Sequence, residues 1–498
     1  MQLRTRYTLP EQRVRYAPLI VLFLLALGLR SYRLEWNPIW LDEAYGYQLG
    51  HQGIGGIIGN TLVNVHPPLY TILQWLASGL DTLHSEWGWR WPSVVLGAAT
   101  VPVIYLLART LTDVWSAVIA GFLAVLTPTH IFFSQESRPY ALITFLAALT
   151  MLLLHLRLRY GNRSLWGIYT ALCILGLWSN YSFALIVSVQ VLYLAYSLRQ
   201  WRSLLIHIGL LTLFFLPFLL IAVSPLSQEL DNYRATQPLT LTHTIQAVLA
   251  GEPLRYKVFW AHTWLPLVFG GLALLGLPAA VRSWSSSPAA YHWLQVLLPP
   301  IGFFGIAVPL FGIMLPVFEA KQFVVLLPSV FVLLAVGIHR LRQIRPAWLH
   351  GLALLGICAV IIAGNLLALQ RYWTITKSPE GLAVLALRER MQPDDAIVSL
   401  HYSVDAVLSF YLPQATVYTK PGRDGDTYRF SRSLSILIGD RQKITRPATV
   451  ATIRQHRRFW LLRLEADDRP LIGDLTQGCT TSVAQRYDPF QLLLVECP

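Results

Sequence analysis

Apolar runs of about 20 residues, the length that crosses a bilayer as a helix, recur along the first three-quarters of this chain. A further apolar segment, 69–83, is shorter and contains Gln74 and Asp81, which predicts an interfacial or re-entrant piece. The pattern therefore predicts a polytopic α-helical membrane protein with about eleven transmembrane helices. The predicted spans are 17–34, 91–108, 114–133, 139–156, 164–179, 181–198, 203–223, 263–281, 291–315, 322–339 and 347–368.

After residue 368 the pattern becomes that of a soluble domain. The stretch "SPEGLAVLALRERMQPDDAIVSL" predicts a helix capped by Ser378, a turn at Asp394 and Asp395, and a strand. "ATVYT", "RFWLLRL" and "FQLLLVEC" predict further strands. We therefore expect a transmembrane domain, 1–368, and a small C-terminal α/β domain, 369–498, which is long enough to bury a core of its own.

Arginine distribution orients the predicted spans. Arginines crowd the N-terminal tail, and they recur in three turns between spans, at 155–163, 197–202 and 339–345. Because cytoplasmic loops carry the excess of Lys and Arg, and because 69–83 is not expected to cross, all of these fall on the cytoplasmic side. The first apolar run has no signal-peptide cleavage site and is expected to stay as a helix. The sequence thus predicts a multi-pass protein of the inner (plasma) membrane, with a cytoplasmic N-terminus and an extracytoplasmic C-terminal domain.

Composition supports the membrane class. The chain is 54% hydrophobic and only 13% charged, whereas a soluble globular protein carries roughly 25% charged residues. The net charge of +13 comes from arginines scattered between apolar runs, which reflects topology more than a nucleic-acid-binding face. No nucleic-acid partner is therefore expected.

Cysteine and acid spacings give no metal site. Cys173 and Cys358 lie inside apolar runs, while Cys479 and Cys497 lie near the C-terminus and could form a disulfide if their domain is extracytoplasmic. No Asp-x-Asp pair occurs in the predicted outer loops. A divalent cation is therefore possible but unsupported, and no other cofactor is implied.

Two adjacent acids, Asp42 and Glu43, follow the first predicted span in the outer loop 35–90. Taken alone, Asp42 would be the N-cap of a helix over "EAYGYQLG", with Glu43 in the first turn beside the helix dipole. The same loop contains "NVHPPLY", where His66 precedes two prolines and a helix start is predicted. A second long outer loop is predicted at 224–262.

Three basic side chains are predicted at the outer ends of spans, where the positive-inside rule disfavours them. Each could be a charge that snorkels to the interface. Three such exceptions with polar neighbours also suit the phosphate of a lipid-linked ligand. They are Arg90, Arg138 (with Glu136 and Tyr140 beside it) and Lys321 (followed by Gln322).

The order of these motifs resembles that of the GT-C glycosyltransferases. The acidic pair, "HPPLY", "R-x-P-S-x-x-x-G-x-x-x-V-P-x-x-Y", "E-x-R-P-Y" and a late "KQFVVLLP" follow one another along the chain. Within that superfamily the sequence is similar, over roughly residues 15–340, to bacterial relatives of the protein O-mannosyltransferases (glycosyltransferase family 39) and of the lipid A aminoarabinose transferase. It departs from the family where Lys321-Gln322-Phe323 replaces a frequent Arg-Tyr.

The resemblance implies a sugar donor carried on a polyprenyl phosphate and used at the outer face of the membrane. The acceptor would be a glycolipid, a polysaccharide or a protein. Asp42 corresponds to the catalytic acid of the first loop, with Glu43 as an orienting or secondary group. Inverting sugar transfer needs a base for the acceptor's proton and positive charge for the departing phosphate. The residues expected to bind the donor phosphate or substrate are His66, Arg90, Glu136, Arg138, Tyr140, Lys321 and Gln322.

Two other classes of function stay open. A transporter or flippase of lipid-linked sugars would place charges near the membrane midplane, whereas the predicted spans are nearly free of charge there. A non-catalytic envelope-assembly protein would bind a partner through its outer domain and would tolerate Asp42→Asn. In the enzyme interpretation, the C-terminal domain and loop 224–262 are expected to help select the acceptor.

Overall fold

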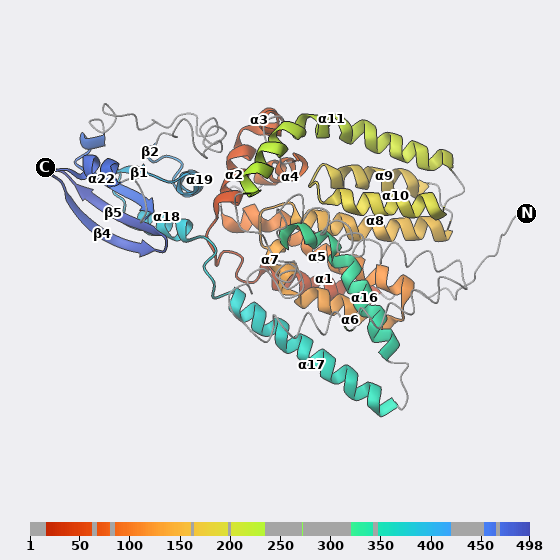
Figure 1. The fold of residues 1–498 in the computed structure, drawn as a ribbon. Coiled ribbons are helices and arrows are strands. Elements are labelled where there is room, and N and C mark those ends of the chain that lie inside the picture. Colours follow the sequence, from red (N-terminus) through yellow and green to blue (C-terminus); the bar gives the residue numbers. More distant parts are fainter. Residues whose placement is uncertain are drawn as a thin grey trace, which may run out of the picture.

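The computed structural model describes residues 16–61, 67–79, 85–160, 164–197, 201–234, 271, 320–341, 347–419, 453–464 and 469–498. The described residues up to 372 are mostly helical, and a β-sheet flanked by helices follows them (Figure 1). The helices of the first part are α1 (Tyr16–Ser31), α2 (Leu41–His51), α3 (Gly53–Thr61), α4 (Leu69–Ser78), α5 (Glu86–Leu111), α6 (Val114–Leu126), α7 (Pro128–Ser134), α8 (Tyr140–Tyr160), α9 (Ser164–Leu177), α10 (Phe183–Ser197), α11 (Trp201–Arg234), the 3₁₀ helix η4 (Ala320–Leu326), α16 (Leu327–Leu341) and α17 (Ala347–Tyr372).

Five helices of the described part are long and apolar enough to cross a membrane, and α6 with α7 would add a sixth as a bent span. Three shorter apolar helices, α1, α9 and α10, also coincide with predicted spans. The protein is therefore a mostly helical membrane protein, as predicted. The count of eleven stays a prediction, because the predicted spans 263–281 and 291–315, apart from residue 271, lie outside the described residues.

The ambiguous segment 69–83 contains only the ten-residue helix α4 in its described part. At about 1.5 Å of rise per residue, this helix covers half the thickness of the hydrocarbon core. Its length agrees with a segment that does not cross. Its place at the interface stays a prediction.

A break between α6 and α7 bends that span by 56°. Pro128 begins α7 and has no N–H to donate to the carbonyl of Ala124, four residues earlier. The buried guanidinium of Arg30 donates instead, from Nη2 to Ala124 O at 3.1 Å and from Nη1 to Val125 O at 3.4 Å. Nη2 of Arg30 also lies 2.7 Å from Nδ1 of His130. An arginine of α1 thus supplies the donors that the break leaves missing.

The C-terminal part has a five-stranded mixed sheet in the order β2-β1-β3-β5-β4. β1 pairs in parallel with β2 and β3, and β5 pairs antiparallel with β3 and β4. Cys479 and Cys497, at the paired ends of β4 and β5, form a disulfide. The elements are α18 (Pro379–Arg390), β1 (Ala396–Ser399), α19 (Tyr402–Tyr411), β2 (Val417–Thr419), β3 (Arg458–Leu464), α22 (Arg469–Thr476), β4 (Thr480–Tyr487) and β5 (Phe490–Glu496).

Local predictions for this part are largely confirmed. Ser378 caps α18 and accepts a hydrogen bond from the N–H of Gly381 at 3.0 Å. The strands expected at "ATVYT", "RFWLLRL" and "FQLLLVEC" are β2, β3 and β5. β4 was not predicted, because its sequence "TTSVAQRY" is polar and its side chains are mostly exposed. It forms one edge of the sheet, and β2 forms the other.

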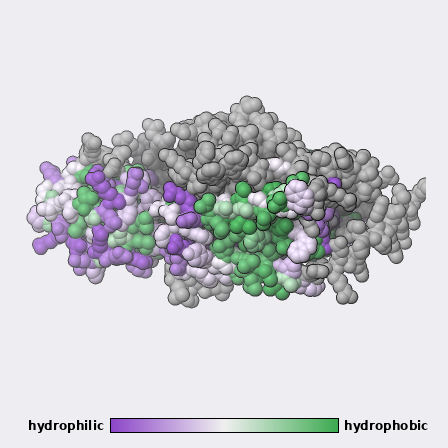
Figure 2. All heavy atoms as spheres, turned by 90° about the horizontal axis from the view of Figure 1, so that it is seen from below, coloured by the Kyte–Doolittle hydropathy of each residue, from purple (hydrophilic) through white to green (hydrophobic). Residues whose placement is uncertain are grey.

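A shared hydrophobic core joins the two parts of the chain. Ile39, Tyr47 and Trp89 of the helical part pack in one cluster with residues of α18, α19 and the sheet, among them Val407 and Trp460. Figure 1 shows α2 at this junction, between the helical bundle and α19. On the face seen in Figure 2, hydrophobic residues gather over the bundle and hydrophilic residues over the C-terminal part. The helix with the acidic pair therefore lies where the apolar and polar parts of the molecule meet.

Candidate active site at the first-loop acids

Asp42 and Glu43 lie in the first turn of α2. The predicted N-cap role of Asp42 is wrong: the N-cap position is Trp40, and no side chain caps the helix. Because successive residues of an α-helix point about 100° apart, the two carboxylates face different surroundings. The side chain of Glu43 is completely buried, whereas that of Asp42 is 27% exposed.

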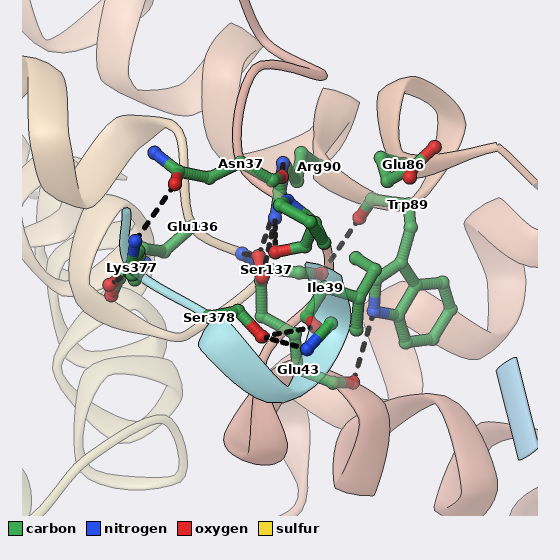
Figure 3. A network of polar contacts seen from close by, with 12 residues as sticks. Asn37, Ile39, Glu43, Glu86, Trp89, Arg90, Glu136, Ser137, Lys377 and Ser378 are labelled. Carbon is green, nitrogen blue, oxygen red and sulfur yellow. Dashed lines mark hydrogen bonds and ion pairs between the residues drawn. The ribbon is translucent and has the colours of Figure 1, made fainter. Parts of the chain in front are cut away.

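Glu43 pairs with Arg90 in the protein interior (Figure 3). Nε and Nη2 of Arg90 donate to its two carboxylate oxygens at 2.9 and 2.7 Å, and the N–H of Ser137 donates to Oε1 at 2.8 Å. Burial alone would raise the pKa of Glu43, but the charge and hydrogen bonds of Arg90, with the charge of Lys377, lower it below the usual glutamate value. Glu43 is therefore held as a carboxylate.

Arg90 has every donor engaged. Besides its two bonds to Glu43, Nη1 donates to the carbonyls of Leu34 and Asn37 at 2.7 and 2.8 Å, and Nη2 donates to that of Pro38 at 3.2 Å. These contacts account for all five N–H groups of a guanidinium. In this arrangement Arg90 has no donor left for a phosphate. It ties the loop before α2 to the start of α5.

Arg138 is held far more loosely and lies beside Asp42. Its Nη2 is 3.4 Å from Asp42 Oδ2 and its Nη1 is 3.5 Å from the Asp42 carbonyl, while its buried Nε has no hydrogen-bond partner. Burial alone would lower the pKa of Arg138, but the charge of Asp42 and the contact with Tyr140 raise it, so the guanidinium stays charged. A charged, incompletely bonded arginine therefore adjoins a partly exposed carboxylate.

Glu136 pairs with Lys377, from the segment between α17 and α18 (Figure 3). Both side chains are largely buried. Burial raises the pKa of Glu136 above the usual glutamate value, and the charge of Lys377 opposes this shift only in part. The buried negative charge of Glu136 is therefore compensated in part by the ammonium group of Lys377.

Tyr140 and Lys321 approach the same region from α8 and η4. The Thr144 hydroxyl donates to the Val324 carbonyl at 3.3 Å, which joins the two elements. Lys321, half-buried, is near enough for its charge to act on Tyr140. His66 and the side chain of Gln322 lie outside the described residues, so their predicted roles stay predictions.

The structure thus brings together seven of the predicted residues. Tyr140 lies near Asp42, Arg138 and Lys321, while Glu43 forms a buried ion pair with Arg90 and Glu136 forms one with Lys377. Sequence reasoning missed Lys377, although lysine is rare in this chain and this one adjoins a helix cap. Within the described ranges, no three His, Cys, Asp or Glu side chains gather as a metal site would require.

The predicted resemblance to the GT-C glycosyltransferases is confirmed by comparison with known proteins. Residues 65–223 match the family of dolichyl-phosphate-mannose-protein mannosyltransferases. No curated protein sequence matches the chain.

Among solved structures, the chain is similar to ArnT from Cupriavidus metallidurans. The apo form is 13% identical with a TM-score of 0.63, over 95% of this chain and 97% of ArnT. The form bound to undecaprenyl phosphate is 14% identical with a TM-score of 0.62, over 96% and 98%. The Archaeoglobus fulgidus oligosaccharyltransferase tethered to an acceptor peptide is 12% identical with a TM-score of 0.52, over 91% of this chain and 69% of that protein. At these identities the comparisons establish the fold.

Proposed function

We propose that this protein is a membrane glycosyltransferase that transfers a sugar, with inversion, from a polyprenyl-phosphate donor to an acceptor at the outer face of the membrane. The observation that carries the proposal is the partly exposed Asp42 carboxylate beside the incompletely bonded Arg138, at the junction of the apolar and polar parts. The fold supports it, since the similar ArnT has been solved with undecaprenyl phosphate bound. The acceptor class is a glycolipid, polysaccharide or protein.

Asp42 is the proposed general base. It takes the proton from the acceptor's attacking oxygen while that oxygen bonds to the anomeric carbon from the face opposite the phosphate. The bond between the anomeric carbon and the phosphate oxygen breaks, and polyprenyl phosphate leaves with one additional negative charge. A carboxylate held on a packed helix and open to solvent on one side suits this task.

Arg138 and Lys321 are the cations proposed to bind the departing phosphate. His66, Tyr140 and Gln322 from the predicted set are proposed to bind the donor beside them. Positive charge placed where negative charge develops stabilises the transition state. Arg90 and Glu43 act differently in this proposal. Their complete mutual bonding supports a role in holding α2 and not in binding the donor.

The disulfide between Cys479 and Cys497 supports the outer location of the C-terminal part. Disulfides form and persist in oxidising compartments such as the periplasm or the cell exterior. The distribution of arginine points to the same orientation. The membrane itself is proposed to be the plasma membrane.

The test is sugar transfer by purified, reconstituted protein supplied with radiolabelled polyprenyl-phosphate sugars and envelope acceptors. Asp42→Asn is expected to lower the transfer rate by at least about a hundredfold, because the base is lost. The matched control is Asp394→Asn, an exposed acid of the turn before β1, which should leave transfer unchanged. Undiminished transfer by the Asp42 variant would overturn the assignment of the base.

A further inference from the structure

The short segment 37–40 leads directly into α2 and so determines where Asp42 is held. Its polar groups are bonded from two sides. On the side of the helical bundle, Arg90 binds the carbonyls of Asn37 and Pro38. The carbonyl of Trp40 accepts the N–H of Ala44 within the helix start. The remaining contacts come from the C-terminal part.

Residues 377–381, which we call the latch, bind the other side of this segment (Figure 3). The N–H of Lys377 donates to Asn37 Oδ1 at 2.9 Å, and the Ser378 hydroxyl donates to the Ile39 carbonyl at 3.0 Å. Gly381 packs so closely that an added Cβ would lie 2.5 Å from Pro38 Cβ and 3.0 Å from the Ile39 carbonyl oxygen. Gly381 therefore leaves no space for a side chain against Pro38 and the Ile39 carbonyl.

Tyr411, at the end of α19, adds a second contact from the C-terminal part. Its hydroxyl accepts the N–H of Ile39 at 2.9 Å and donates to Glu86 Oε1, at the start of α5, at 2.6 Å. The N–H and the carbonyl of Ile39 thus both bind residues far along the chain. Segment 37–40 cannot shift without breaking bonds to the C-terminal part.

The side chain of Lys377 extends the latch to the other half of the site. Its ammonium pairs with Glu136, and it lies over the rings of Trp40 and Phe132 at 5.0 and 4.6 Å from their centroids. Glu136 is two residues from Arg138, whose guanidinium contacts Asp42. One lysine therefore contacts the segment before Asp42 and the segment before Arg138.

We propose that Lys377 is a positioning residue, and that the latch makes turnover depend on the docking of the C-terminal part. This inference rests on the proposed function, because it concerns the same Asp42 and Arg138. When the latch is bound, the spacing between the carboxylate and the guanidinium is set. When it is released, segments 37–40 and 136–138 lose the contact that Lys377 makes to both, and the Arg90–Glu43–Ser137 contacts still join them.

The test uses the full-length reconstituted protein with Lys377→Met, which removes the charge and keeps an apolar stem. We expect kcat for sugar transfer to fall by about ten- to a hundredfold, as misplacement of reacting groups by about 1 Å does, with KM for the donor within about twofold. Lys377→Arg, which restores a cation, should recover part of kcat. The matched control is Arg390→Gln, because Arg390 bonds to Ala484 and Gln485 of the same C-terminal part.

Amide hydrogen exchange gives a readout that does not depend on activity. In Lys377→Met, amides of residues 37–47 should exchange faster, while those of β3 should keep the wild-type rate, because the sheet is not touched by the change. If wild-type protein transfers no sugar to any acceptor, the proposed function fails, but this exchange experiment still tests whether the Lys377 side chain holds segment 37–40 in place. Unchanged exchange in residues 37–47 overturns the proposal.

Two further outcomes also test the positioning role of Lys377. An unchanged kcat in Lys377→Met overturns the positioning role, and a raised donor KM with an intact kcat would make Lys377 a donor-binding residue instead. Glu136→Gln combined with Lys377→Met should be no slower than the slower single variant, since each change removes the same contact. Additive losses would contradict a shared role.

Discussion

Two arginines of this site, Arg90 and Arg138, have different roles. Arg90 makes five bonds in the interior, whereas Arg138 makes two long contacts with Asp42, contacts Tyr140 and leaves Nε unpartnered. Both occur beside prolines or aromatic residues at the ends of predicted spans, so the sequence alone assigns them one role. The difference lies in partners such as the carbonyls of 34–38, which no motif reveals.

Substitution should separate these two arginines. Arg90→Gln leaves the buried Glu43 without its partner and should lower the stability of the protein by about 3–5 kcal/mol. Arg138→Gln should leave the thermal midpoint nearly unchanged and reduce sugar transfer, because the positive charge beside Asp42 is lost. Thermal unfolding in detergent, followed by transfer assays on the folded fraction, measures both. A stable Arg90→Gln with weakened donor binding would return Arg90 to the donor-binding set.

At the scale of elements, periodicity predicts helices well and their internal irregularities poorly. The apolar runs at 91–108 and 139–156 are α5 and α8. The run at 114–133 is also helical, but it is broken after Leu126. Pro128 is a residue type that breaks helices, yet the apolar pattern predicts 114–133 as one continuous span. That Arg30 of another helix bonds the carbonyls at the break is not visible in the sequence, because the contact joins residues about a hundred positions apart.

The break offers an element-level prediction. Arg30→Met removes the donors to Ala124 and Val125, and each buried carbonyl left unbonded should cost about 1–3 kcal/mol. Pro128→Ala restores an N–H four residues after Ala124, so the double variant should be more stable than Arg30→Met alone. Thermal midpoints in detergent report both effects. Arg109→Met, a half-buried arginine at the far end of α5, is the control. A double variant no better than the single would contradict the proposed pairing at the break.

At the scale of the whole molecule, the boundary drawn at 368–369 marks a change in composition but not a boundary in packing. The helix α2, placed by sequence in the transmembrane domain, shares its core with α18 and α19. This contact depends on apolar residues of α2 such as Ala44 and Tyr47, which in sequence are equally suited to a membrane interface. Deleting residues 369–498 would therefore disturb the site itself, so a role of this part in acceptor selection needs point variants on its surface.

Cysteine chemistry tests the orientation of the molecule. If the C-terminal part is extracytoplasmic, Cys479 and Cys497 should resist a thiol reagent in intact cells until a membrane-impermeant reductant is added. Changing both to serine should lower stability by about 3 kcal/mol, the value expected for closure of a loop with a sequence separation of 18. Labelling without prior reduction, or only after cell lysis, would place this part on the other side.

The adjacency of Asp42 and Glu43 has a consequence for how variation in this protein is interpreted. Asp42→Asn should leave the normal amount of inactive protein in the membrane. Glu43→Gln, one residue further along, should lower the amount of folded protein. A screen that scores only the phenotype of cells would rank the two as equals. A screen that also measures protein abundance would separate the two neighbouring codons: changes at Asp42 would affect catalysis, and changes at Glu43 would affect folding.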